Sequence, residues 1–135
     1  MSDETSHVEL SQEEINFLNS IFDLAREGKA TALESLLAQG IPADLTDAKG
    51  NTLLILAAYH QHPELVKLLL NREASIDSLN DRGQTALICA VFRDNQEIAQ
   101  LLIKAGANLN IGFQKPLEVA EFFGLENMKK YLQNQ

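Results

Sequence analysis

The chain has 135 residues, of which 45% are hydrophobic and 22% charged, and its formal net charge is −8 at pH 7. This length and apolar content suit one domain with a substantial core. An acidic chain without a block of Lys and Arg argues against nucleic acid as a partner, because phosphate binding depends on such clusters.

Targeting signals and disulfides are also missing from the sequence. The start MSDETSHVEL lacks the pattern of a secretory signal. No apolar run approaches the roughly 18 residues that a membrane-spanning helix needs, so we expect no membrane partner. Cys89 is the only cysteine, which rules out an internal disulfide and a cysteine-based metal cage. The simplest location is the cytoplasm.

The N-terminal end carries much of the negative charge. Residues 1–14 contain five acids and no Lys or Arg, namely Asp3, Glu4, Glu9, Glu13 and Glu14. We predict that residues 1–10 form an acidic, disordered tail and that residues 11–135 form the folded domain. Ser11-Gln-Glu-Glu14 has the spacing of a capping box, and it predicts the start of a helix in the segment LSQEEINFLNSIFDLAREG.

The stretch TLLILAAYH, residues 52–60, could be a buried strand or a buried helix by its apolar run alone. Thr52 can cap a helix through its hydroxyl, and the Leu and Ala residues that follow favour helix over strand. Proline suits the first turn of a helix, so His62-Pro63 marks the break before a second one. The loop that follows, NREASIDSLNDRG, ends at Gly83, which can adopt a positive φ.

An internal repeat decides the question in favour of helix. Residues 50–77 and residues 83–110 align at a distance of 33 residues, with identical residues at many positions of the pair (among them Gly50, Thr52, Leu54, Ala57, Glu64, Leu68, Leu69 and Ala74 in the first copy). The register extends upstream, where Asp44 precedes Asp77 by 33 residues, and downstream, where Lys115 follows Thr85 by only 30. We therefore predict four units of two helices each, at about residues 11–46, 47–79, 80–111 and 112–135.

These units resemble ankyrin repeats. The resemblance rests on G-N-T-L-L-I-L-A-A-x5-E-L-V-K-L-L-L, on G-Q-T-A-L-I-C-A-V-x5-E-I-A-Q-L-L-I and on A-G-A-N-L-N at residues 105–110. It implies an all-α solenoid of stacked helix-turn-helix units, in which the end units carry solvent-tolerant outer faces. The family's Thr-Pro-Leu-His is replaced by Thr-Leu-Leu-Ile and Thr-Ala-Leu-Ile in the second and third units and by Lys-Pro-Leu-Glu in the last. The second and third units therefore lose a helix-start constraint and a hydroxyl-to-imidazole hydrogen bond.

The sequence contains no recognisable catalytic or metal site, so we expect neither an enzyme nor a bound cofactor or metal. The three histidines are His7, His60 and His62. Cys89 falls in the alanine-rich part of a helix, far in the repeat register from any histidine, and a buried free cysteine usually behaves as a small hydrophobe. The pair Glu13 and Glu14 is explained by the helix dipole.

The resemblance implies that a protein partner binds at the hairpin tips and at the exposed ends of the first helices, on the concave side. Carried onto this chain, those positions give the candidate binding residues Arg26, Lys49, Asn51, Tyr59, His60, Arg82, Gln84, Phe92, Arg93 and Phe122. Tyr59, Phe92 and Phe122 occupy the same position in successive units. Aromatic and arginine side chains concentrate at interface hot spots, but the same rings could instead seal the stack, the role best suited to Phe123.

Three functions fit these features. The first is a monomeric, non-catalytic interaction module, such as an adaptor, an inhibitor or an immunity-type protein, whose partner offers acidic and apolar side chains to the basic residues of the concave face. The second is a carrier that delivers a small cofactor such as haem to a client enzyme, with Tyr59 and His60 as ligands. The third, an enzyme with an unrecognised site, has the least support because the sequence shows no catalytic pattern.

Overall fold

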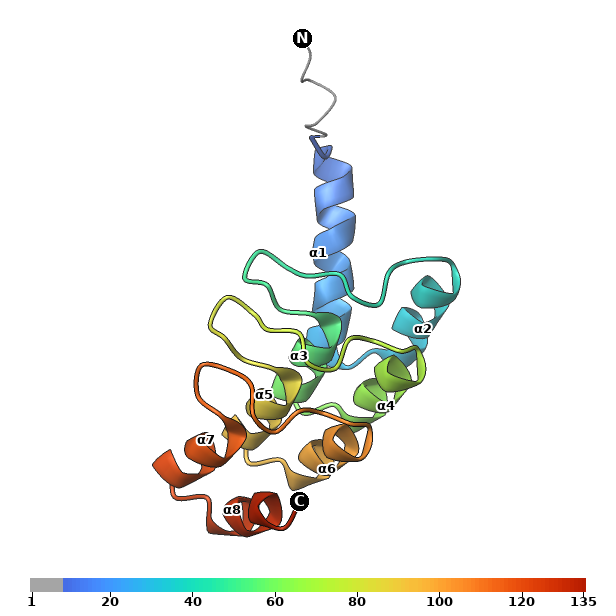
Figure 1. The fold of residues 1–135 in the computed structure, drawn as a ribbon. Helices are drawn as coiled ribbons and strands as arrows, with labels where there is room; N and C mark the ends of the chain where they lie inside the picture. Colours follow the sequence, from blue (N-terminus) through green and yellow to red (C-terminus); the bar gives the residue numbers. More distant parts are fainter. Residues whose placement is uncertain (1–8) are drawn as a thin grey trace.

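The computed structural model describes residues 9–135, which form eight helices arranged as four antiparallel pairs (Figure 1). The helices are α1 (Gln12–Glu27), α2 (Ala30–Ala38), α3 (Leu53–Tyr59), α4 (Pro63–Asn71), α5 (Ala86–Phe92), α6 (Gln96–Lys104), α7 (Pro116–Phe122) and α8 (Glu126–Gln133). The all-α repeat solenoid predicted from the sequence is confirmed. The predicted tail of residues 1–10 lies almost entirely outside the described residues. No helix in the described part is long and apolar enough to cross a membrane.

The helices begin where their local sequence predicts. The hydroxyl oxygen of Thr52 accepts a hydrogen bond from the N–H of Ile55 at 3.0 Å, and Thr85 caps α5 in the same way. Pro63 occupies the first turn of α4. The stretch TLLILAAYH is therefore a capped helix, α3, whose residues Leu53–Ala58 are all buried. Its short length and apolar surface on every side explain why its sequence pattern also suited a buried strand.

The core runs along the whole stack. The first helices α1, α3, α5 and α7 pack side by side, and so do the second helices α2, α4 and α6. Each pair contributes fully buried side chains to one continuous core, among them Ile21, Leu54, Leu69, Leu102 and Met128. Because each unit buries its apolar faces only against its neighbours, the stack is stabilised as a whole.

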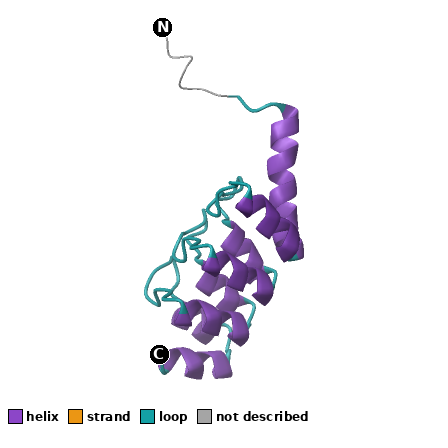
Figure 2. Cartoon of the chain, turned by 90° about the vertical axis from the view of Figure 1, so that its right-hand side faces the viewer, coloured by secondary structure: helices purple, strands orange, loops and turns teal. Residues whose placement is uncertain are grey.

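The hairpin loops that join successive units lie together along one side of the stack (Figure 2). Backbone and side-chain hydrogen bonds tie them in register. A carboxylate oxygen of Asp44 accepts a hydrogen bond from the N–H of Ser75 at 2.8 Å, and Asp77 accepts one from the N–H of Asn108 at 2.9 Å. The 33-residue repetition of aspartate therefore has a structural cause, since each aspartate holds the hairpin of the next unit.

Helix α1 differs from the other first helices. It has 16 residues where α3, α5 and α7 have seven, and its N-terminal half projects beyond the stack (Figure 1). The predicted capping box is present: the Ser11 hydroxyl accepts a hydrogen bond from the N–H of Glu14, and the Glu14 carboxylate accepts one from the N–H of Ser11. Ser11 therefore begins the helix well before Asn19, the residue equivalent to Thr52.

The turn inside each unit uses a left-handed residue just after the first helix. This residue is Gly28 in the first unit, with φ 71°, and Gln61 and Asp94 in the next two, with φ 64° and 53°. Side chains are thus tolerated at this backbone position. Gly28 is different because the ring of His62 lies where its Cβ would be, only 2.4 Å from the ideal Cβ position. His62 in turn bonds through Nε2 to the carbonyl oxygen of Arg26 at 2.6 Å.

Candidate functional site

Aromatic side chains gather at the C-terminal ends of the first helices. The rings of Tyr59 and Phe92 are stacked, with their centroids 6.2 Å apart. Phe123 meets Phe92 edge to face at 5.3 Å, and Phe122 meets Phe123 at 4.9 Å. The predicted row therefore exists between Tyr59 and Phe92, but the ring that continues it is Phe123. We call Tyr59, Phe92, Phe122 and Phe123 the aromatic row.

The residue that follows each first helix covers the ring at the end of the preceding one. The guanidinium of Arg93 lies over the ring of Tyr59 at 5.0 Å, a cation–π contact, and Phe123 lies over Phe92 in the corresponding way. Contacts between neighbouring units thus join different positions of the repeat. Outer surfaces remain open to solvent, since Tyr59 is 36% exposed, Phe92 43% and Phe122 73%.

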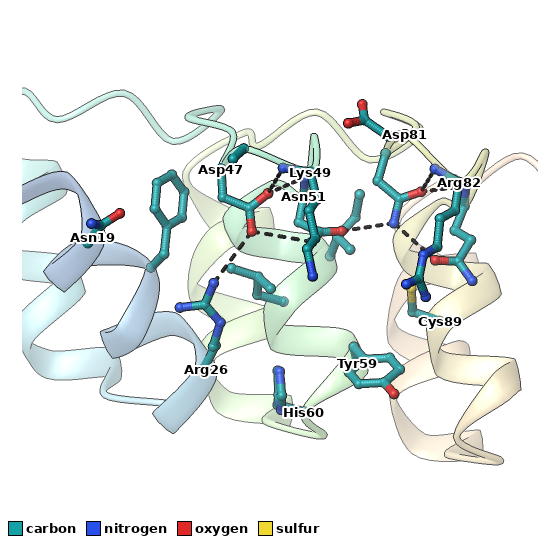
Figure 3. Close-up of a pocket in the computed structure, with 16 residues that line it drawn as sticks. Asn19, Arg26, Asp47, Lys49, Asn51, Tyr59, His60, Asp81, Arg82 and Cys89 are labelled. Atoms are coloured by element: carbon teal, nitrogen blue, oxygen red, sulfur yellow. Dashed lines mark hydrogen bonds and ion pairs between the residues drawn. The ribbon is translucent and has the colours of Figure 1, made fainter. Parts of the chain in front are cut away.

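A large open cavity of about 620 Å³ lies between α1, α3 and the tips of two hairpins (Figure 3). Seven of the ten predicted binding residues line it: Arg26, Lys49, Asn51, Tyr59, His60, Arg82 and Gln84. Asn19 and Phe22 of α1 form one wall, and Cys89 of α5 lies opposite. The sequence register therefore brings residues from three units to one surface.

Asp47 organises the cavity on the side of the first hairpin. One of its oxygens accepts hydrogen bonds from the N–H groups of Lys49 and Asn51, both at 2.9 Å. Its other oxygen lies 3.5 Å from the guanidinium of Arg26, which also pairs with Asp23 at 2.9 Å. Asp47 therefore fixes the hairpin turn and holds Arg26 against the cavity wall.

Asn80, 33 residues after Asp47, fixes the turn of the next hairpin in the same way. Its carbonyl oxygen accepts hydrogen bonds from the N–H groups of Arg82 and Gln84 at 3.0 and 2.9 Å. Its amide nitrogen donates to the side-chain oxygens of Asn51 and Gln84 at 2.8 and 3.0 Å. Asn51 is thus committed to joining the two hairpins, and the backbone that carries Lys49 and Arg82 is held rigidly.

Three cations of this face have no acidic partner in the described part of the chain. Lys49, Arg82 and Arg93 form no ion pair with any carboxylate of residues 9–135, whereas Arg26 forms two. Two carboxylates line the cavity wall: Asp47, which is already paired with Arg26, and the exposed Asp81. A chain of net charge −8 therefore presents a locally basic surface beside the aromatic row.

Two side chains that line this cavity have shifted pKa values. Burial raises the pKa of the Cys89 thiol to about 12, so the thiolate needed for nucleophilic attack is scarce at neutral pH. The pKa of His60 is lowered, first by burial and then by the charges of His62, Arg26 and Arg93. Cys89 is therefore a poor nucleophile in the folded protein, and His60 favours its neutral form.

Sequence reasoning missed several residues of this surface. Asp47 and Asn80 repeat at the 33-residue period, so the period itself carried a signal for them. Phe113 was also missed, although it is the most exposed large apolar side chain of the described residues, at 87%. It lies in the hairpin that is three residues shorter than the others, where the repeat alignment is interrupted.

Comparison with known proteins agrees with this architecture. The family model of ankyrin repeats, in three copies, matches residues 21–112. An ankyrin repeat protein of Pseudomonas aeruginosa is 48% identical over 60 residues, which cover 44% of this chain and 35% of that protein. The match thus spans about a third of the relative's length. Ankyrin repeats are generally protein–protein interaction modules. Since the family model covers more than half of the chain, this protein belongs to the ankyrin repeat family.

Proposed function

We propose that this protein is a non-catalytic adaptor, inhibitor or immunity-type module that binds one partner protein through the aromatic row and the basic hairpin tips. The observation that carries the proposal is the set of three cations, Lys49, Arg82 and Arg93, that have no ion pair within residues 9–135 and lie beside exposed aromatic rings. Exposed apolar surface is costly to leave in water, and the adjacent cations favour a partner surface of opposite charge.

The contacts within the aromatic row also stabilise the stack, but they leave much of each ring uncovered. Tyr59 and Phe92 contact each other across two units, and the rings are still more than a third exposed. A seal alone would not need Arg93 above Tyr59, because that contact uses a charged side chain where an aliphatic one would cover the ring. The arrangement therefore supports a binding role added to a structural one.

The charge of this face supports a partner that offers carboxylates and apolar side chains. Lys49 and Arg82 project from hairpins whose backbones are fixed by Asp47 and Asn80, so the loops lose little conformational freedom on binding. We propose further that the protein acts as a cytoplasmic monomer. The polar helix α8 supports a monomer, since only Met128 and Leu132 of that helix are buried and the rest faces solvent or the stack edge.

The direct test is a quantitative pull-down from the soluble lysate of the source cells. The variant Tyr59→Ala, Phe92→Ala, Arg93→Ala is compared with the wild type after its helical content has been checked. The control variant Arg72→Ala, Gln100→Ala, Lys104→Ala removes the same number of exposed side chains from the second helices. We expect a partner that the wild type and the control capture and the first variant loses. A partner captured equally by all three would refute a role for the aromatic row.

The second candidate function, a carrier for a cofactor such as haem, has one observation in its favour. Tyr59 and His60, two side chains able to bind haem iron, both line the 620 Å³ cavity. An absorbance titration with haem tests this directly. A saturable band that disappears in His60→Ala would support the carrier, whereas an unchanged spectrum of free haem would eliminate it.

A further inference from the structure

The cavity of about 620 Å³ is lined by Arg26, Lys49 and Arg82, and we call it the basic cavity. A second, smaller cavity of about 120 Å³ adjoins it. Ile88 of α5 and Val119 of α7, both buried, form its deep part, and the rings of Phe92, Phe113 and Phe123 surround its mouth. An engineered apolar cavity of about 150 Å³ accepts benzene, so a space of this size suits one aliphatic side chain. Arg82 and Gln84 line both cavities and therefore connect them.

The short third hairpin, between α6 and α7, builds this cavity together with the preceding hairpin through one glycine in each. Phe113 donates a backbone hydrogen bond to the carbonyl oxygen of Gly83 at 2.9 Å, so the two hairpins lie in direct contact. A Cβ on Gly83 would meet the Cβ of Phe113 at 2.9 Å, and a Cβ on Gly112 would meet Ile88 at 2.2 Å. Both glycines have positive φ, 72° and 115°. The close approach brings Phe113 to the wall of the cavity.

The ring of Phe113 has no packing role that would account for it. At 87% exposed it contributes little to the core, and Phe123 beside it is 50% exposed. Phe113 lines the cavity together with Phe92 and Phe123 of the aromatic row, so three rings border one largely apolar space. Apolar rings around such a space gain from an incoming apolar side chain that excludes water.

We propose that this cavity is an apolar subsite that receives one aliphatic side chain of an extended partner segment, whose acidic residue lies against Lys49 and Arg82 in the neighbouring basic cavity. This inference rests on the proposed protein-binding function of the same face. The occupant is a peptide segment of a protein, because the two cavities together match a carboxylate and an aliphatic group on one chain.

The arrangement of the units sets the spacing of the two side chains. Neighbouring packed helices are about 8–10 Å apart, and the two cavities lie in adjacent gaps between units. A polyproline II segment returns to the same face after three residues, about 9 Å, and a β-strand does so after two, about 7 Å. The partner segment therefore carries an acidic and an aliphatic residue two or three positions apart, in either chain direction.

A displayed library of random twelve-residue peptides tests the proposal. Selection is carried out in parallel on the wild type, on Phe113→Ser, on Phe17→Ser and on the Tyr59→Ala, Phe92→Ala, Arg93→Ala variant. Phe17 is an exposed aromatic residue of α1 that lines neither cavity, and it serves as the matched control. Circular dichroism confirms that Phe113→Ser folds, which its exposure and its unchanged backbone hydrogen bond lead us to expect.

The expected result is a wild-type pool enriched in Asp or Glu with Leu, Ile or Val two or three positions away. The Phe17→Ser pool has the same preference, and the Phe113→Ser pool keeps the acidic residue but loses the aliphatic one. An acidic pool without an aliphatic preference, or a preference that survives Phe113→Ser, overturns the subsite and leaves the proposed function standing. If the wild type enriches nothing beyond what the triple variant enriches, the subsite and the peptide-binding function are both refuted.

A synthetic peptide from the selected pool then measures the subsite directly. Replacing its aliphatic residue by Ala should weaken binding to the wild type at least about tenfold, which corresponds to about 1.4 kcal/mol. The same replacement should change binding to Phe113→Ser by less than about threefold, because the two changes remove one contact. Equal losses on both proteins would show that the aliphatic residue binds elsewhere.

Discussion

Gly28→Ala tests how the first two units are joined. In this turn the equivalent residues Gln61 and Asp94 carry side chains at positive φ, so the backbone conformation alone does not require glycine. The requirement at Gly28 comes from the ring of His62, which occupies the place of the missing Cβ and bonds to the carbonyl oxygen of Arg26. Alanine at this position must displace that ring.

The expected cost has two parts. An alanine in a left-handed conformation costs about 1 kcal/mol relative to glycine. Displacing the His62 ring adds about 1–3 kcal/mol, from the lost hydrogen bond and from overpacking. Gly28→Ala should therefore lower the free energy of unfolding by about 2–4 kcal/mol. Gly124→Ala is the matched control, because Gly124 has φ 66° and no atom within 4 Å of its ideal Cβ position. It should cost only about 1 kcal/mol.

A double-mutant cycle isolates the contribution of the ring. Urea unfolding is followed by circular dichroism for the wild type, Gly28→Ala, His62→Ala and the double variant, and the slopes are compared to detect separate unfolding of the first unit. In the His62→Ala background, Gly28→Ala should cost about 1 kcal/mol, which leaves a coupling energy of about 1–3 kcal/mol. Equal costs of Gly28→Ala and Gly124→Ala, or a coupling near zero, would refute the explanation.

Three further predictions concern Thr52, Cys89 and His60. Thr52→Val should lower the free energy of unfolding by about 1 kcal/mol in the same urea assay, because the N–H of Ile55 loses its acceptor; no change would mean that the cap contributes nothing. Cys89, with its pKa raised to about 12 and 2% exposure, should react with a thiol reagent at pH 8 only after unfolding, and rapid labelling of the native protein would contradict its burial. The pKa of His60 lies below its usual 6.5 in the folded protein, so the unfolded chain binds more protons between the two values. The free energy of unfolding should therefore fall as the pH drops from above 6.5 through the folded-state pKa, and His60→Gln should reduce that slope; an identical pH profile in both proteins would refute the shift.

The repeat and its helices were predictable because their signals are local or periodic. Thr52 and Pro63 act on residues within one turn of themselves, and their effects are the same wherever the unit stands in the stack. The 33-residue period then places equivalent residues on one surface, which is why seven predicted residues meet at the basic cavity. The burial of Cys89 was predictable for the same reason, since α5 is apolar on every side.

The contacts between units were decided only by the tertiary structure. The alignment places Phe122 with Tyr59 and Phe92, yet the ring against Phe92 is Phe123, because the stacking offset sets one unit's turn over the helix end of its neighbour. The position of Phe113 depends on two glycines that let a shortened hairpin approach the previous one. Periodicity fixes which residues are equivalent within each unit. The offset between units comes from how their side chains pack, and that packing determines which residues touch across the binding face.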